Sequence, residues 1–96
     1  ETVYIPIPYA GTVSRVTTVL EGAITVADAT ITPATSAGNM ETITVAFSGS
    51  AAGDVDSVDP ASNVTVTDND YVSITTDGGS TTAQRLWVTI VVERSA

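Results

Sequence analysis

Apolar and polar residues alternate along several short stretches of this chain, and prolines, glycines and acidic residues separate those stretches. The first such stretch has side chains on two faces: Val3, Ile5, Ile7 and Tyr9 on one, and Tyr4, Pro6 and Pro8 on the other. A period of two residues predicts a strand. Proline has no N–H to donate to a neighbouring strand, so residues 1–9 are predicted to form an edge strand or an arm extending onto a neighbouring subunit.

Residues 12–32 are rich in valine, isoleucine and threonine, whose β-branched side chains favour strands. The pair Glu21-Gly22 resembles a turn, so we predict two strands joined there. A helix is the alternative, because some apolar residues also recur at steps of three and four: Val13, Val16, Leu20, Ala27 and Ile31. Gly22 would cost a helix about 1 kcal/mol relative to alanine, which favours the strands. The apolar pattern changes phase near residues 27–29, which indicates a bulge or a short break.

The middle of the chain predicts one strand between two loops. Residues 33–39 are small residues and turn formers, typical of a loop. Residues 42–47 predict a strand with three side chains directed inward: Ile43, Val45 and Phe47. Residues 48–63 are acidic and weakly hydrophobic, so they predict a long loop with at most one helical turn, capped by Ser50 or Asp54.

The next segment predicts two strands separated by a turn. Their inward side chains are Val64 and Val66 in the first strand, and Val72 and Ile74 in the second. Asp, Asn, Gly and Ser gather at residues 68–70 and 77–80, which predicts a turn at each place.

The last predicted strand, residues 86–92, is apolar on both faces, which is typical of a strand in the middle of a sheet or against a partner. Counting it, about seven or eight strands follow one another at short, even spacing, with no helix-length segment between them. Valine, isoleucine and threonine supply 38 of the 96 residues. We therefore predict an all-β chain, for which this spacing is typical of a sandwich or a small barrel. Of the two we favour a sandwich, with residues 1–96 forming a single antiparallel β-sandwich domain of jelly-roll type.

Charge and reactive side chains narrow the range of functions. The net charge is −8, and only Arg15, Arg85 and Arg94 are basic, so we expect neither nucleic acid nor an anionic membrane surface as a partner. The chain contains no histidine, cysteine or lysine, which excludes most nucleophile–base pairs and most transition-metal sites. Paired carboxylates remain, but glycosidases need a cleft lined with aromatics and this chain has five aromatic residues. We expect a protein that is not an enzyme and holds no cofactor.

The acidic segments do not have the spacing of a calcium loop. An EF-hand needs acids at its first, third and fifth positions, glycine at the sixth and glutamate at the twelfth. Asp54, Asp56 and Asp59 stand at the first, third and sixth positions, with Pro60 next. We expect a solvated acidic loop in which Asp54 caps a turn, and the same for Asp68-Asn69-Asp70. Asp77-Gly78-Gly79 predicts a turn and not a phosphate loop, because no lysine follows it.

Trp87 has three interpretations. It packs within the fold, it anchors a subunit interface, where tryptophan is favoured, or together with Tyr71 it stacks on a sugar. The residues that we select as candidate partner contacts are Tyr4, Pro6, Pro8, Tyr9 and Trp87.

Several longer segments resemble a group of small virion proteins of tailed bacteriophages. The segments are residues 4–13 (YIPIPYAGTV), 19–24 (VLEGAI), 27–32 (ADATIT), 49–57 (GSAAGDVDS) and 74–81 (ITTDGGST). They recur in this order and span most of the chain. The group is similar to the head decoration proteins, also called capsid cement proteins.

That resemblance implies a compact β-domain that sits as a homotrimer on the outer capsid surface of the virion. It implies that the major capsid protein is the partner, and that the domain clamps neighbouring capsid subunits against internal DNA pressure. It supplies no defined catalytic or binding residues. Two alternatives stay open: another virion β-module, such as a head-fibre base or tail piece, and a carbohydrate-binding module.

Overall fold

A computed structural model of the chain describes residues 2–25, 27–76 and 86–94. These residues form nine strands and no helix, which confirms the all-β prediction. The strands are β1 Thr2–Ile7, β2 Gly11–Leu20, β3 Ala29–Thr35, β4 Gly38–Asn39, β5 Ile43–Val45, β6 Val55–Val58, β7 Thr65–Val66, β8 Asp70–Thr76 and β9 Leu86–Arg94.

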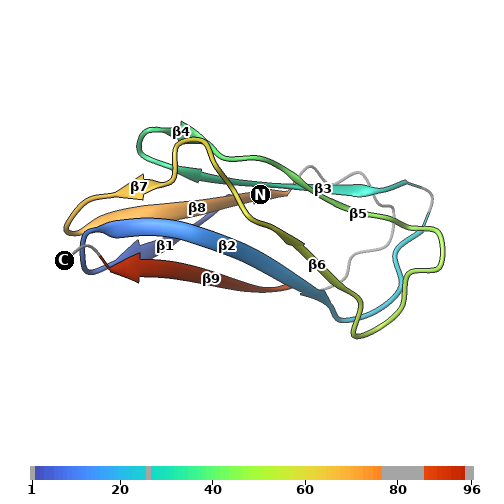
Figure 1. Cartoon of the computed structure of the whole chain (residues 1–96). Helices are drawn as coiled ribbons and strands as arrows, with labels where there is room; N and C mark the ends of the chain where they lie inside the picture. The colour runs from blue at the N-terminus through green and yellow to red at the C-terminus, as the bar shows by residue number, and fades with distance from the viewer. Residues whose placement is uncertain (1, 26, 77–85, 95–96) are drawn as a thin grey trace.

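The strands form two antiparallel sheets that pack face to face as an elongated sandwich, with principal extents of 43 × 20 × 19 Å (Figure 1). In the first sheet, β1, β8 and β3 lie side by side, and β4 and β5 pair with different parts of β3. In the second sheet, β2 is central, with β9 along one side and β6 and β7 along the other. The sandwich prediction is confirmed, whereas the jelly-roll connectivity stays a prediction.

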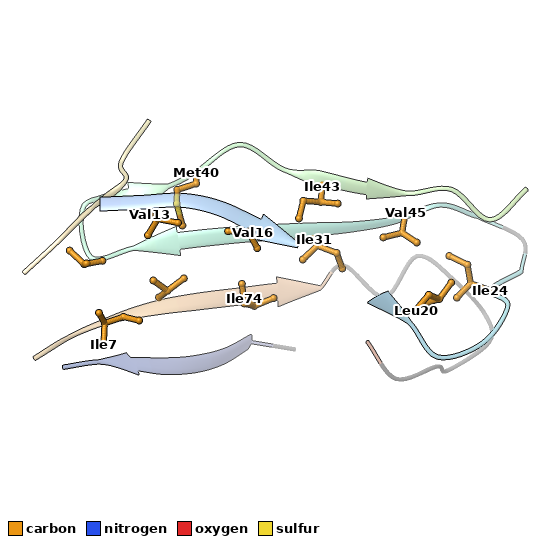
Figure 2. Close-up of a cluster of buried hydrophobic side chains, with 12 residues drawn as sticks. Ile7, Val13, Val16, Leu20, Ile24, Ile31, Met40, Ile43, Val45 and Ile74 are labelled. Atoms are coloured by element: carbon orange, nitrogen blue, oxygen red, sulfur yellow. The ribbon is translucent and has the colours of Figure 1, made fainter. Parts of the chain in front are cut away.

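The core fills the space between the two sheets and consists of aliphatic side chains (Figure 2). Its buried members are Ile7, Val13, Val16, Leu20, Ile24, Ile31, Met40, Ile43, Val45, Val66, Val72 and Ile74. Along β2, the inward positions change from odd to even after a bulge between Val13 and Arg15. The bulge therefore brings both Val13 and Val16 into the core, although the two positions are an odd number of residues apart.

The two strands predicted within residues 12–32 both exist, but they do not form a hairpin. The first strand is β2, which ends at Leu20, and β3 begins only at Ala29 in the other sheet. Ile24, in the connection between them, is buried in the core, and the Ser50 hydroxyl binds its backbone. That hydroxyl accepts from the Ile24 N–H and donates to the Ile24 carbonyl, both at 3.0 Å. The predicted turn at residues 21–22 is wrong as a hairpin, because burial of Ile24 takes the chain to the opposite sheet.

Residues 33–35, predicted as part of a loop, belong to β3. Pro33 is fully buried and pairs with Ile74 of β8. Its missing N–H leaves no gap in a ladder, because β5 pairs with β3 up to Ile31 and β4 pairs only from Ala34 onward. The Pro33 carbonyl is used, since it accepts from the Met40 N–H at 2.8 Å. A proline between two short partner strands is compatible with an interior strand.

Residues 48–63 contain a strand in place of the predicted long loop. This strand, β6, pairs with residues 16–19 of β2, and the described segment contains no helical turn. Ile43 and Val45 of β5 are buried as predicted, but Phe47 is 41% exposed. β5 ends at Val45, and the Phe47 N–H donates to the Asp28 carboxylate at 3.0 Å, outside any ladder.

The predictions for β8 and β1 are confirmed, whereas the prediction of a central position for β9 is wrong. Val72 and Ile74 are buried in β8, and the turn before it has Asn69 at a positive φ of 58°. The described part of the predicted segment 1–9 follows the edge-strand alternative, because β1 pairs with β8 along its length and with nothing else among the described residues. β9 is not in the middle of its sheet, because β2 is its sole partner within the described ranges. The turn predicted at residues 77–80 lies outside the described residues.

Candidate interaction surfaces

The five predicted partner contacts do not gather in one place. Tyr4 and Pro6 lie on the outer face of the first sheet, and Trp87 lies on the outer face of the second. Pro8 and Tyr9 follow β1 in the connection to β2. The exposed aromatic side chains therefore occupy opposite faces of the sandwich.

Three residues form a patch on the outer face of the first sheet, which we call the tyrosine patch: Tyr4, Pro6 and Tyr71. The ladder between β1 and β8 pairs Pro6 with Tyr71. The Tyr4 and Tyr71 rings meet edge to face, with centroids 5.2 Å apart and an interplanar angle of 77°. Tyr4 is nevertheless 65% exposed, so the patch presents aromatic surface to solvent.

A second apolar row crosses the outer face of the second sheet, and we call it the tryptophan row: Trp87, Val19 and Val55. The ladders place Val19 of β2 between Trp87 of β9 and Val55 of β6. Trp87 is 64% exposed and Val55 is 63% exposed. The interpretation in which Trp87 packs within the fold is therefore wrong. β9 is an edge strand and Trp87 is directed away from the core.

The rows beside the tryptophan row are polar but carry no net charge. Thr89, Thr17 and Ser57 form the next row. Beyond it, Val91 pairs with Arg15, and Asp59 follows directly after β6. Arg15 donates to Asp59 through Nε at 2.7 Å and through Nη2 at 3.3 Å. This hydrogen bond lowers the pKa of the Asp59 carboxyl and raises the pKa of Arg15. On a chain of net charge −8, the row of Thr89, Thr17 and Ser57 carries no charge, so it costs less to desolvate than the acidic surface elsewhere.

Tyr9 has contacts within the chain. Its hydroxyl donates to the Val92 carbonyl at 3.5 Å, and the Arg94 guanidinium lies 5.4 Å from the centre of its ring. These contacts hold the end of β9 against the connection between β1 and β2. Pro8 is exposed beside it. Contact of Tyr9 or Pro8 with a partner stays a prediction.

The carboxylates serve local structure and do not converge. Asp54 accepts from the Ala51 N–H at 2.9 Å, which makes it the turn cap that we predicted, while Asp56 and Asp59 lie along and after β6. The segment is a strand in place of the expected loop. In the described part of the chain, no three acidic residues are placed to hold a metal ion together.

Sequence reasoning missed one carboxylate that organises a connection and underrated another. Glu41 accepts from the N–H groups of Ala61 at 2.7 Å and Ser62 at 3.1 Å, and these bonds lower its pKa. Asp70 accepts from the N–H groups of Tyr71 and Thr67 and from the Ser36 hydroxyl, which also lowers its pKa. The Asp70 contacts with Thr67 follow the local Asp–turn pattern. Glu41 bridges some 20 residues and has no local signal.

No helix among the described residues is long and apolar enough to cross a membrane. Comparison with protein-family models, with curated proteins and with solved structures found no match to this chain.

Proposed function

We propose that this chain is a capsid decoration protein of a tailed bacteriophage, a virion structural protein that binds the outside of the major capsid protein lattice and stabilises the head. The resemblance of the segments described above supports the proposal. The observation that carries it is the placement of two exposed apolar surfaces, the tyrosine patch and the tryptophan row, on opposite faces of one sandwich.

A protein that clamps a shell needs at least two attachment surfaces held rigidly apart. The two sheets share a core that separates the two surfaces by the full thickness of the sandwich (Figure 1). Tyrosine and tryptophan are the residues that most often anchor protein interfaces. One surface is thus available for the capsid protein, and the other for one side of the contact with a sister copy in the proposed homotrimer.

Charge supports the same partner. The chain has eleven acidic residues against three arginines, and Arg15 is already paired with Asp59. The acidic surface is repelled by packaged DNA and complements basic residues on a capsid exterior.

The test is binding to heads that were assembled without this chain. Purified protein is mixed with such heads, and the pellet after centrifugation is compared for the wild type, Tyr4→Ala, Trp87→Ala and the control Phe47→Ala. Phe47 is an exposed aromatic residue in neither surface. We expect wild type and control to bind and raise the melting temperature of the heads, and at least one of the other variants to lose binding. Failure of the wild type to bind heads would overturn the proposal. Electron microscopy density for the chain in a fibre or tail would favour that alternative.

The exposure of Trp87 also favours a carbohydrate-binding module as a second candidate. One face of a solvent-exposed indole can stack on a sugar ring, and Thr17 and Thr89 place hydroxyls in the adjacent row. A glycan array probed with the wild type and Trp87→Ala tests this candidate, which requires binding that depends on the tryptophan.

A further inference from the structure

β9 is a long strand, and among the described residues no strand pairs with the edge that faces away from β2. It spans nine residues and, within the described ranges, pairs with β2 alone. Natural edge strands are usually blunted by proline, lysine, an inward charge or a covering segment. β1 has Pro6 in its ladder, whereas β9 has no proline or lysine and carries its charges only at its end, in Glu93 and Arg94.

The contacts of β9 show which of its backbone groups are free. The Val91 carbonyl faces β2, because it accepts from the Ser14 hydroxyl at 3.4 Å. The Glu93 carbonyl also faces β2, since a side chain added at Gly11 would collide with it. Carbonyl directions alternate along a strand, so the even-numbered residues direct their N–H and C=O groups away from β2. These residues are Leu86, Val88, Ile90 and Val92. Among them, the Val92 carbonyl already accepts from the Tyr9 hydroxyl at 3.5 Å, so the free part of the edge lies at Leu86, Val88 and Ile90.

The side chains of β9 also leave apolar surface uncovered on both faces. The four even-numbered residues face the core but are only half-buried. On the outer face, Trp87 and Val91 are exposed. A further strand along this edge would use the free backbone groups and cover apolar surface on both faces.

We propose that the strand added to this edge is β9 of a second copy, paired antiparallel about a two-fold axis at Thr89. In this register Trp87 lies opposite Val91 of the second copy, an aromatic–β-branched pair of the kind that stabilises sheets. On the inner face, Val88 lies opposite Ile90, so the free backbone groups of these two residues meet. Leu86 lies opposite Val92, whose carbonyl has a second lone pair beside the one that accepts from Tyr9. Thr89 lies opposite its own copy at a position without ladder bonds, where side chains come closest.

Self-complementarity identifies the second copy as the occupant of this edge. A shift of the axis by one residue to Ile90 would place Glu93 opposite Trp87 and Arg94 opposite Leu86, which opposes charges to apolar side chains. With the axis at Thr89, every pair between residues 86 and 92 is apolar or threonine. Residues 86–92 contain none of the acidic residues that give each copy its charge of −8. Physiological salt screens charges more than about 8 Å apart, which weakens the repulsion between two copies.

On a phage head, this contact would join one proposed trimer to the next across a two-fold axis, and that role rests on the proposed function. Pairing of two copies in solution does not depend on the proposed function. The two ideas are therefore tested separately, by the mass of the free protein and by binding to heads.

The experiment is sedimentation equilibrium of the purified chain with two charge variants and a matched control. T89K and T89E place like charges directly opposite each other across the proposed axis, which opposes pairing. S57K adds the same lysine to the same row of the same sheet, but on β6, away from the axis. Circular dichroism confirms that each variant keeps its strand content.

We expect the wild type and S57K to form dimers. T89K and T89E should each have a dissociation constant several-fold higher than the wild type, so that at a concentration where the wild type is dimeric their mass falls to half. An equimolar mixture of T89K and T89E should associate again, because opposite charges then meet at the axis. A wild type that stays monomeric at millimolar concentration would overturn the inference, and so would T89K with unchanged mass or a mixture that is not rescued. Loss of head binding together with the expected masses would instead count against the proposed function alone.

Discussion

At Gly11, β2 leaves no room for a side chain beside β9, and replacing Gly11 with alanine tests the pairing of these two strands. Gly11 is buried and pairs with Arg94 in the ladder. An added Cβ would collide with the Glu93 carbonyl oxygen and lie 2.9 Å from Val92 Cγ1. Backbone atoms cannot rotate out of the way, so the end of β9 must shift.

The size of the effect follows from two opposing contributions. Overpacking of this kind typically costs about 1–3 kcal/mol. Replacing glycine with alanine also restricts the unfolded chain, which stabilises the protein by about 0.4–1 kcal/mol where the backbone conformation is compatible. Gly11 is not among the described glycines with positive φ, so this second contribution applies. The free energy of unfolding of Gly11→Ala should therefore be lower by about 1–2 kcal/mol.

Urea unfolding followed by circular dichroism measures this change. With a urea slope of about 1–3 kcal/mol/M for a domain of this size, the midpoint should fall by about 1 M. The control is Thr12→Ala, the next residue of the same strand, whose side chain is exposed and whose change should stay within about 0.5 kcal/mol. A Gly11→Ala variant as stable as the wild type would refute the close approach of β9 to β2, and with it the strand directions used to assign the free edge.

Three further predictions concern the core and the connections. Ile31→Ala should lower the free energy of unfolding by about 2–5 kcal/mol, because Ile31 is 2% exposed and lies between the sheets; urea unfolding measures it, and a smaller loss would contradict close packing there. Thr35→Val should cost about 1–3 kcal/mol in the same assay, because the buried hydroxyl donates to the Asn63 carbonyl at 2.6 Å and accepts from the Ala37 N–H. The folded-state pKa values of Glu41, Asp59 and Asp70 are lowered, so the stability that these carboxylates contribute is complete above their unfolded pKa values of about 4. It is lost as the pH falls below about 4 and through the lowered folded-state pKa values. Melting curves across that range should show less acid sensitivity in Asp70→Asn than in the wild type, and equal sensitivity would contradict the role of Asp70.

Alternation within single strands was predictable, and pairing between distant strands was not. Val72 and Ile74 are buried because a period of two residues on an amphipathic strand is a local property. Pro33 was assigned to a loop because proline usually ends a ladder, and only the gap between β4 and β5 makes it acceptable in β3. β6 was missed because its acidic sequence lacks a strand signal, and its pairing with β2 outweighs that local preference.

The same limit applies to the candidate surfaces. Tyr4, Pro6 and Trp87 were selectable from the sequence as aromatic or proline residues on a strand. Val55 was not, because only the ladders from β6 through β2 to β9 place it in one row with Trp87. Tyr71 joins Tyr4 for the same reason, through the register of β1 on β8. Surfaces built across several strands depend on register, and register is set by the whole sheet.

The two edge strands differ in a way that links these surfaces to assembly. β1 has a proline within its ladder and is followed by a second, so its edge offers fewer donors to another chain. β9, of comparable apolar character and greater length, has no such protection in residues 86–92. A monomer with this edge exposed would be prone to pair with a second copy or with other chains. The edge strand of the other sheet, β1, contains a proline that opposes such pairing, and β9 does not. An edge that is apolar on both faces and matched to its own copy about Thr89 is therefore best explained as a contact that the protein uses. The rescue of T89K by T89E distinguishes this contact from a merely sticky strand, because only a paired Thr89 position responds to the sign of the charge opposite it.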